Sequence, residues 1–325
     1  MKTVMEYEEF KKELLRQVSE RLGEDGEAEV IPVNKNNGIL KETIGIHGNT
    51  GGLKPLVYVE SLYEQYCMCG DFSACVGFVT GLYHSMMDLH MEQYFESWEV
   101  VKPRIVVRVA NLKRNQAELE NIPHKRYLDL AVYCRVILAE NENGTASTAV
   151  KKSMLHYLGV GEEELWEAAR SSFRKEKFWI RHIDEAIGIS GKILEKLLKL
   201  PPCKDETYIL TNEYRCSGAV GMLRFDLLEK FAEQKEADLF VLPSSVNEVL
   251  VIPDRGNQTP EFLRTLVKKN NEFYPDEGDL SENIYYYRRG QKKLEIILSK
   301  LEEGEESARE EGWLSADEAE KSLGL

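Results

Sequence analysis

The stretch "ADLFVLPSSVNEVLVIPD", residues 237–254, is the part of the sequence that decides the fold class. Two short runs rich in Val, Leu and Ile flank a Pro-Ser-Ser segment, a pattern typical of two strands joined by a turn. An amphipathic helix pattern, "FDLLEKFAEQKE", precedes the stretch, and Thr259-Pro260 follows it as a helix start. The runs "TYILTN" and "SGAVGML" are interpreted as further short apolar strands. Strands interleaved with helices predict a compact α/β layer over residues 204–290.

The preceding part of the chain predicts a domain of mixed helices and antiparallel strands over residues 1–200. A first helix is expected over 6–22, a hairpin turning at 36–38, and a second helix over 73–97. The run "YLDLAVYCRVILAENENGTASTAV" indicates two strands joined at Asn143-Gly144. Pro201-Pro202 closes a further helix pattern and is the predicted domain boundary.

Residues 291–325 predict an acidic helical tail. Apolar side chains at helical spacing begin the segment, namely Leu294, Ile297, Leu298 and Leu301. A second helix start follows at residues 315–318, where Ser-Ala-Asp-Glu forms a capping box. The fold class expected for the whole chain is therefore α+β, with two domains and a helical tail.

Composition bounds the location and the partners of the protein. The net charge of −14 argues against general nucleic-acid binding, which needs a basic surface. The first fifteen residues lack the apolar core of a signal peptide. The longest apolar run, residues 130–139, is shorter than a membrane span and contains Arg135. These features predict a cytoplasmic protein that does not contact a membrane.

The charges are unevenly distributed along the chain. Residues 300–325 hold nine acidic and three basic side chains, so −6 of the −14 lies there. Residues 102–126 are basic, with only Glu118 and Glu120 as acids, and their candidate patch is Arg104, Arg108, Lys113, Arg114, Lys125 and Arg126. A solvated face is the simplest interpretation of this patch. A site for phosphate, RNA or an acidic peptide is the alternative.

Neither a metal nor a cofactor is expected from the sequence. Cys67, Cys69 and Cys75 lie close together, but their spacing does not match the paired Cys motifs of zinc sites. His84 and Asp88 would share a helix face, yet two ligands make an incomplete zinc site. No glycine-rich loop is followed by the Lys-Ser or Lys-Thr of a phosphate-binding loop. The cysteines are therefore interpreted as reduced thiols.

Four segments resemble, in this order, an uncharacterised family of unknown function from gut bacteria, DUF5688. They are "RYLDLAVYCRVIL", "YILTNEYRCSGAVGML", "DLFVLPSSVNEVLVIPD" and "ENIYYYRR". The resemblance covers residues 6–290, and its most distinctive block is Leu-Pro-Ser-Ser, residues 242–245. It implies no activity, because the family has none established.

The segment around Ser244, Ser245, Asn247 and Glu248 is the candidate ligand contact. As a hydrolase site it would use a serine as nucleophile and Glu248 as base, but no histidine occurs between His182 and residue 325. The family more often has a histidine where this chain has Asn247. We favour a turn in which the serines bond nearby backbone groups, with a small-ligand contact as the next alternative.

Trp313 and Leu314 are candidate partner anchors, because they precede a capped helix and are flanked by acids. The segment resembles the toxin-binding tails of bacterial type II antitoxins, which implies a basic protein partner for residues 302–325. Folding back onto the chain's own domain is the alternative. The leading functional hypothesis is a non-enzymatic interaction or regulatory protein. A hydrolase centred on residues 242–248 and an RNA- or nucleotide-binding module using residues 102–126 are the alternatives.

Overall fold

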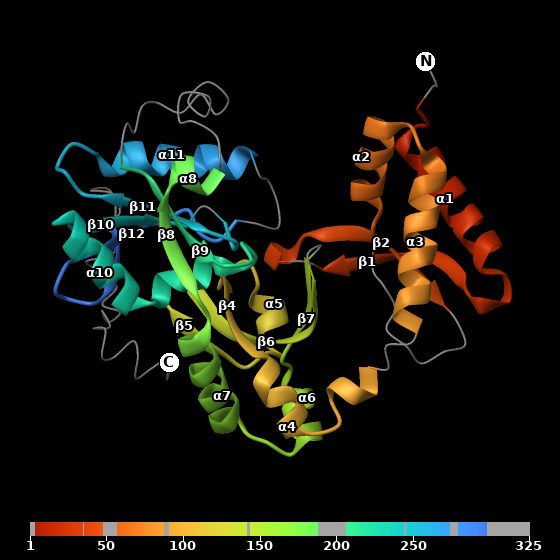
Figure 1. Cartoon of the computed structure of the whole chain (residues 1–325), viewed down its shortest axis with the longest axis horizontal. Helices are drawn as coiled ribbons and strands as arrows, with labels where there is room; N and C mark the ends of the chain where they lie inside the picture. The colour runs from red at the N-terminus through yellow and green to blue at the C-terminus, as the bar shows by residue number, and fades with distance from the viewer. Residues whose placement is uncertain are drawn as a thin grey trace. The chain divides into compact units, whose positions relative to one another are not determined.

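The computed structural model describes residues 4–34, 36–47, 57–87, 91–141, 144–187, 206–243, 245–273 and 279–297. The chain divides into two compact units, residues 1–97 and residues 98–325, here called the N-terminal unit and the C-terminal unit. Helices combine with three antiparallel sheets over the described residues, so the fold class is α+β (Figure 1).

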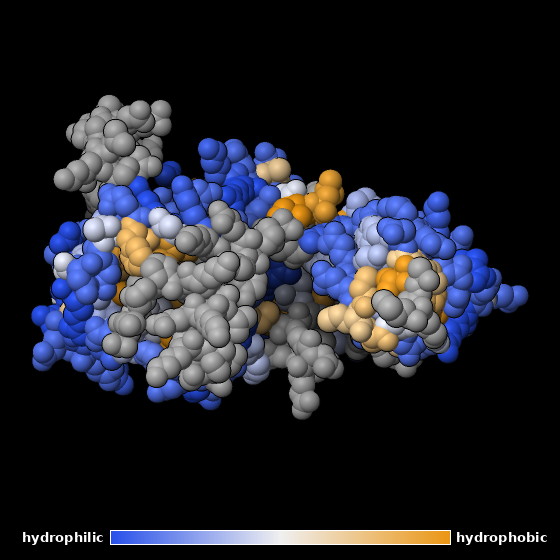
Figure 2. All heavy atoms as spheres, turned by 90° about the horizontal axis from the view of Figure 1, so that it is seen from above, coloured by the Kyte–Doolittle hydropathy of each residue, from blue (hydrophilic) through white to orange (hydrophobic). Residues whose placement is uncertain are grey.

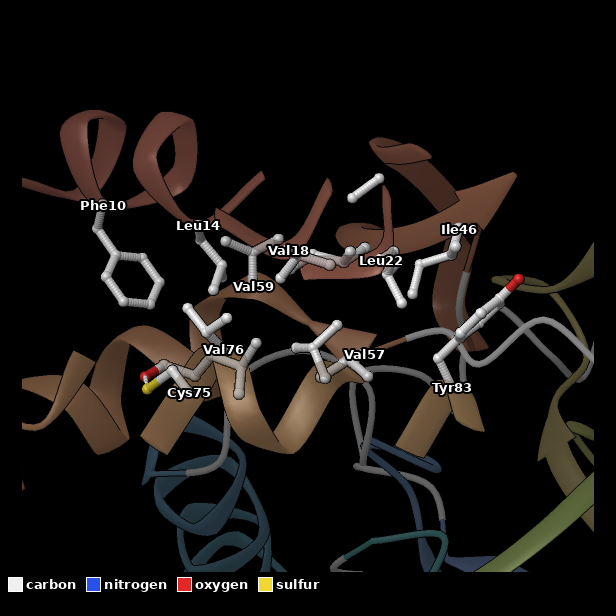
Figure 3. Packing of buried hydrophobic residues seen from close by; sticks show 14 of the residues in the cluster. Phe10, Leu14, Val18, Leu22, Ile46, Val57, Val59, Cys75, Val76 and Tyr83 are labelled. Atoms are coloured by element: carbon white, nitrogen blue, oxygen red, sulfur yellow. Dashed lines mark hydrogen bonds between the residues drawn. The ribbon is translucent and has the colours of Figure 1, made fainter. Parts of the chain in front are cut away.

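The N-terminal unit packs three helices against a small antiparallel sheet. Its elements are α1 (Tyr7–Leu22), β1 (Glu27–Asn34), β2 (Leu40–His47), β3 (Val57–Tyr58), α2 (Val59–Cys69) and α3 (Phe72–Met87). Phe10, Leu14, Val18 and Leu22 recur every three to four residues along α1 and are all buried. Figure 3 shows them facing Val76 and its neighbours across the core. The first helix and the hairpin are therefore confirmed.

The helix expected over residues 73–97 is shorter than predicted. α3 ends at Met87, and a separate helix, α2, precedes it. Gly70 adopts a left-handed conformation with φ 68° and closes α2. Cys67 and Cys69 therefore lie in the last turns of α2, and Cys75 lies in α3. Cys75 and Cys134 are buried, whereas Cys67 and Cys69 are exposed. All five cysteines within the described residues are free thiols.

The C-terminal unit contains two sheets. The four-stranded sheet consists of β4 (Ile105–Asn111), β5 (His124–Tyr127), β6 (Leu130–Asn141) and β7 (Gly144–Ala149), with β6 pairing all the others. The six-stranded sheet has the order β13-β12-β10-β11-β9-β8. Its strands are β8 (Phe178–His182), β9 (Tyr208–Asn212), β10 (Leu239–Leu242), β11 (Val249–Pro253), β12 (Ile284–Tyr287) and β13 (Leu294–Ile297). Every pairing is antiparallel.

Helices cover these sheets. They are α4 (Trp98–Val101), α5 (Gln116–Leu119), α6 (Lys152–Leu158), α7 (Glu162–Lys175), α8 (Ile183–Ile187), α10 (Phe225–Lys235) and α11 (Pro260–Phe273), with the 3₁₀ segments η4 (Lys102–Arg104) and η5 (Gly218–Leu223). α11 packs Leu263, Leu266 and Val267 onto one face of the six-stranded sheet. As predicted, Thr259 caps α11, because its hydroxyl accepts a hydrogen bond from the Phe262 N–H at 3.2 Å.

The domain division differs from the boundary predicted at Pro201-Pro202. β8 precedes those prolines and β9 follows them, yet the two strands pair along residues 178–182 and 208–212. The chain instead divides between Ser97 and Trp98. Proline interrupts local helix patterns, but a sheet is assembled by strands distant in sequence, so a local break does not separate domains here.

Two further predictions are corrected by the structure. "SGAVGML" was expected to be a strand, but Gly218–Leu223 forms η5, in which every residue is buried. Leu294 and Ile297 were expected on a helix, but they lie on β13 and pair with β12. Leu294 opposes Tyr287 and Ile297 opposes Ile284, so the two side chains lie on opposite faces. Because apolar side chains three residues apart lie on opposite faces of a strand but on one face of a helix, this spacing favoured a helix in the sequence.

The "IYYY" run of β12 ties the two sheets of the C-terminal unit together. The Tyr285 hydroxyl donates to Asp129 at 2.5 Å, and the Ser281 hydroxyl donates to the same carboxylate at 2.5 Å. Asp129 directly precedes β6 of the other sheet. Tyr287, on the same face, donates to Glu229 of α10 at 2.6 Å. These bonds join β12 to the residue before β6 and to α10.

Candidate functional site

A cleft with a volume of about 630 Å³ lies in the described part of the C-terminal unit. It lies between the end of α7, the strands β4 and β6, the segment η4, and the residues that follow β9. This volume falls in the range of small-ligand sites, about 300–1,000 Å³. Figure 2 shows that the face it views is mostly hydrophilic, with apolar residues gathered in a few places.

A buried polar network lies beside this cleft. Both carboxylate oxygens of Glu176 accept hydrogen bonds from one nitrogen of Arg108 at 3.2 Å. Asn212 donates to the same carboxylate at 2.9 Å, and Arg224 donates to the Glu176 carbonyl at 3.2 Å. Arg108 is 9% exposed and Asn212 is 1% exposed. Buried charges need such partners, because an unpaired one loses its hydration without compensation.

The two most distinctive segments of the sequence meet at this network. The backbone carbonyl of Asn247 accepts a hydrogen bond from the Thr211 hydroxyl at 2.6 Å and from the Gly218 N–H at 3.1 Å. The Asn247 side-chain oxygen accepts from the Ser217 N–H at 2.9 Å. Asn212 accepts from the Cys216 N–H at 3.2 Å. The loop after β9 is thereby fastened to the turn between β10 and β11.

The turn at residues 243–248 has the local bonding predicted for a structural serine. The Ser245 hydroxyl accepts hydrogen bonds from the N–H groups of Asn247 at 3.1 Å and Glu248 at 3.3 Å. The Ser245 N–H in turn donates to the Glu248 carbonyl at 3.2 Å. Ser244 lies outside the described residues. The arrangement of Ser245 is that of a turn-forming side chain.

Glu248 is half-buried, and burial raises the pKa of its carboxyl above the ordinary range, while the positive charge of Arg215 opposes this rise. A base for a serine would need to hydrogen-bond the serine hydroxyl. In the described region, the contacts of the Ser245 hydroxyl are the two backbone N–H groups named above. The backbone N–H groups of residues 216–218 are occupied by Asn212 and Asn247. Within the described residues, the Ser245 hydroxyl is therefore engaged by the backbone of its own turn.

The six residues of the predicted basic patch do not share one surface. Arg108 pairs opposite Tyr133 of β6, whereas Lys125 pairs opposite the adjacent Val132, so the two side chains lie on opposite faces of the sheet. Lys125 stands over the ring of Trp166 at 4.7 Å, and burial lowers the pKa of its amine.

The remaining members of the patch are also separated. Arg114 is held by Asp279 at 3.2 Å and Glu282 at 2.6 Å. Arg104 donates to the Leu138 carbonyl at 3.5 Å. Arg126 donates to the Leu128 carbonyl at 3.1 Å, and Lys113 is exposed. Only Arg108 of the six lines the cleft.

Lysines supply most of the positive charge of the cleft. Its lining includes four basic side chains, Lys102, Arg108, Lys175 and Lys177, and three acidic ones, Glu99, Glu176 and Glu213, a sum of +1. Arg108 is paired with Glu176, and Lys177 with Glu213 at 3.4 Å. Among the described residues, Lys102 and Lys175 have no acidic partner and are exposed.

Sequence reasoning missed Lys175, because a basic residue in the last turn of a helix is ordinarily explained by the helix dipole. Lys102 belonged to the basic stretch but was not placed in its candidate patch. What singles out both lysines is their common cleft, and residues 102 and 175 meet there only through the tertiary fold. Trp313 and Leu314, the predicted partner anchors, lie outside the described residues.

Neither a metal cluster nor a membrane span is found in the part of the chain that the structure describes. No group of three or more His, Cys, Asp or Glu side chains there could hold a metal ion. No described helix is long and apolar enough to cross a bilayer.

Comparison with known proteins places the chain in a family. No curated protein matches the chain, and neither does any solved structure. A family model described as a family of unknown function, DUF5688, matches residues 7–289. The match extends over parts of both units of the fold and includes every described residue of the cleft. The chain therefore belongs to the DUF5688 family.

Proposed function

We propose that this chain is a non-enzymatic binding protein whose cleft takes an anionic ligand with an apolar body. The observation that carries the proposal is the pair Lys102 and Lys175, which flank a 630 Å³ cleft without acidic partners in the described chain. The protein as a whole has a net charge of −14, so a cleft lined by an excess of bases stands out from its surroundings.

The lining supports a ligand with two kinds of surface. Pro103, Val106, Ile137 and Ala168 contribute apolar atoms, and Tyr214 adds an aromatic ring that is 64% exposed. Ligand sites typically combine apolar walls with a few polar groups that fix orientation. An anion bound by the two lysines would leave its apolar part against this wall.

The hydrolase alternative has less support. The Ser245 hydroxyl accepts two backbone hydrogen bonds, which is a turn geometry and leaves the hydroxyl without a side-chain base in the described region. The RNA alternative requires a continuous basic surface, and the predicted patch is divided between the two faces of a sheet. A separate protein partner bound through residues 302–325 stays a prediction, since that segment lies outside the described residues.

A fluorescent amphiphilic anion tests the proposal. Anilinonaphthalene sulfonate combines an aromatic body with one negative charge and becomes emissive in apolar surroundings. We expect the variant Lys102→Ala/Lys175→Ala to bind it about tenfold more weakly than the wild type, equivalent to about 1.4 kcal/mol for two charges. The matched control is Lys230→Ala/Lys268→Ala, which removes two exposed lysines of α10 and α11.

The control variant should bind the probe within twofold of the wild type. Binding to the wild type should also weaken as salt rises, because ions screen exposed charges. Equal affinity in the wild type and the Lys102/Lys175 variant would overturn the proposal, as would an equal loss in the control variant.

A further inference from the structure

We infer that the cleft is occupied by the acidic segment of the same chain, residues 302–325, with Trp313 and Leu314 as the apolar anchor. This inference rests on the proposed function, because it names the anionic ligand of the same cleft. Its structural basis is the charge of the cleft, the course of the last described strand, and the length of chain between that strand and the anchor.

Charge complementarity favours this segment as occupant. Residues 300–325 carry −6, and the lining of the cleft sums to +1 in a chain of net −14. Within the segment, acids lie on both sides of Trp313-Leu314. The cleft has the complementary arrangement, with apolar side chains such as Val106 and Ile137 in its wall and the exposed lysines 102 and 175 beside it.

The strand directions bring the chain to the same end of the sheet as the cleft. Successive neighbours from β8 to β13 are all antiparallel, so their directions alternate across the sheet. β9 runs opposite to β8, so β9 ends at the end of the sheet where β8 begins. Four more antiparallel pairings lead from β9 through β11, β10 and β12 to β13, so β13 runs parallel to β9 and ends at that same end. Lys177, just before β8, and Asn212, at the end of β9, both line the cleft. The chain therefore leaves β13 at Ile297 heading toward the end of the sheet that holds the cleft.

The distance to be crossed is short compared with the intervening chain. The strand register aligns Ile297 of β13 with Arg181 of β8 across the sheet. Arg181 is four residues after Lys177, which lines the cleft. Five strand spacings of about 4.8 Å and four rises of about 3.3 Å give a separation of about 27 Å. Trp313 lies sixteen residues after Ile297, which can span about 53 Å when extended. The anchor can thus reach the cleft of its own chain.

Zero-length cross-linking of the full chain tests the contact directly. A carbodiimide joins a lysine amine to a carboxylate in contact with it, forming an amide while the carbodiimide takes up the water as a urea. We expect peptides in which Lys102 or Lys175 is joined to an acid of residues 302–325. A mixture of isotope-labelled and unlabelled protein should give cross-links within labelled or within unlabelled chains. Mixed pairs would show a second copy in the cleft and overturn the inference, as would the absence of these cross-links.

Competition with the probe gives an independent readout. The full-chain variant Trp313→Ala/Leu314→Ala should bind anilinonaphthalene sulfonate about tenfold more tightly than the wild type. A tenfold change is expected if the segment fills the wild-type cleft about nine-tenths of the time, because only the open tenth can then bind the probe. Leu323→Ala, in the same segment but away from the anchor, is the matched control and should leave the affinity within twofold. Unchanged affinity in the anchor variant would refute the inference.

The two proposals can fail separately. Adding Lys102→Ala/Lys175→Ala to the anchor variant measures the cleft without the competing anchor. If the lysines matter for probe binding there, but the anchor substitution alone changes nothing, the proposed function stands and the self-occupied cleft is wrong. If the lysines do not matter in either background, the proposed function itself is wrong.

Discussion

Replacing Gly218 with alanine should weaken the hydrogen bonds that join the loop after β9 to the turn between β10 and β11. A β-carbon built at Gly218 would lie 2.2 Å from the Thr211 hydroxyl, 2.5 Å from the Asn212 nitrogen and 2.9 Å from the Asn247 carbonyl oxygen. Two of these three atoms belong to the backbone, so no side-chain rotation can relieve the contacts. The backbone at Gly218 does not have a left-handed φ, so alanine suffers here from crowding and not from conformational strain.

The cost follows from two contributions. Overpacking a rigid site typically costs about 1–3 kcal/mol. Moving Asn247 away also weakens its bonds to the Gly218 N–H and the Thr211 hydroxyl, at about 0.5–1.5 kcal/mol each. We expect a loss of about 3–4 kcal/mol. For a unit of this size, each kcal/mol lowers the melting temperature by about 2–4 °C, which predicts a decrease of about 6–16 °C.

Tryptophan fluorescence isolates the relevant unit. All four tryptophans, at positions 98, 166, 179 and 313, belong to the C-terminal unit, so urea or thermal unfolding followed by their emission reports that unit alone. Gly81→Ala is the matched control, because no atom lies within 4 Å of a β-carbon there and the residue is in α3 of the other unit. The control should leave the tryptophan transition unchanged. If the free energy of unfolding of the Gly218→Ala variant is within about 0.5 kcal/mol of the wild-type value, the proposed role of this close contact is wrong.

Three further substitutions have defined expected outcomes. Arg108→Met should destabilise the C-terminal unit by about 3 kcal/mol in urea unfolding, because the Glu176 side chain, only 14% exposed, loses its cation. Adding Glu176→Gln should recover part of this loss. Glu42→Gln should lower the stability of the N-terminal unit at neutral pH, measured by circular dichroism. Lys11 holds the pKa of Glu42 below its ordinary range, so the wild-type advantage should be complete above about pH 4.5 and disappear as the pH falls through that lowered pKa; an undiminished difference in acid would contradict this linkage. Ser245→Ala should cost about 0.5–2 kcal/mol, and a fluorophosphonate probe should label neither protein, whereas labelling lost on this substitution would support the hydrolase reading.

Local chemistry accounts for the elements that the sequence predicted correctly. The apolar spacing of Phe10, Leu14, Val18 and Leu22 predicts α1, because only a helix places them on one face. Asn37 and Gly38 adopt positive φ, as the hairpin between β1 and β2 requires. In both cases neighbours in the sequence contain the deciding information.

Prediction failed where burial removed the periodic signal. Gly218–Leu223 is buried at every residue, so its composition does not distinguish a strand from the 3₁₀ turn that Asn247 holds in place. β13 has Leu294 on one face and Ile297 on the other, and this spacing of three residues is also that of a helix face. The boundary at Pro201-Pro202 was misleading for a related reason, since the pairing of β8 with β9 is a long-range contact that no local pattern encodes.

The sequence by itself determined the fold class, the family resemblance, the separation of charge between residues 102–126 and 300–325, and the role of Ser245 in a turn. Only the tertiary structure decided which bases share a cleft. Arg108 and Lys125 are close in sequence but lie on opposite faces of a sheet, whereas Lys102 and Lys175 are distant and line one cavity. Strand pairing reverses neighbouring side chains and joins distant ones, so a linear run of charge does not specify a surface.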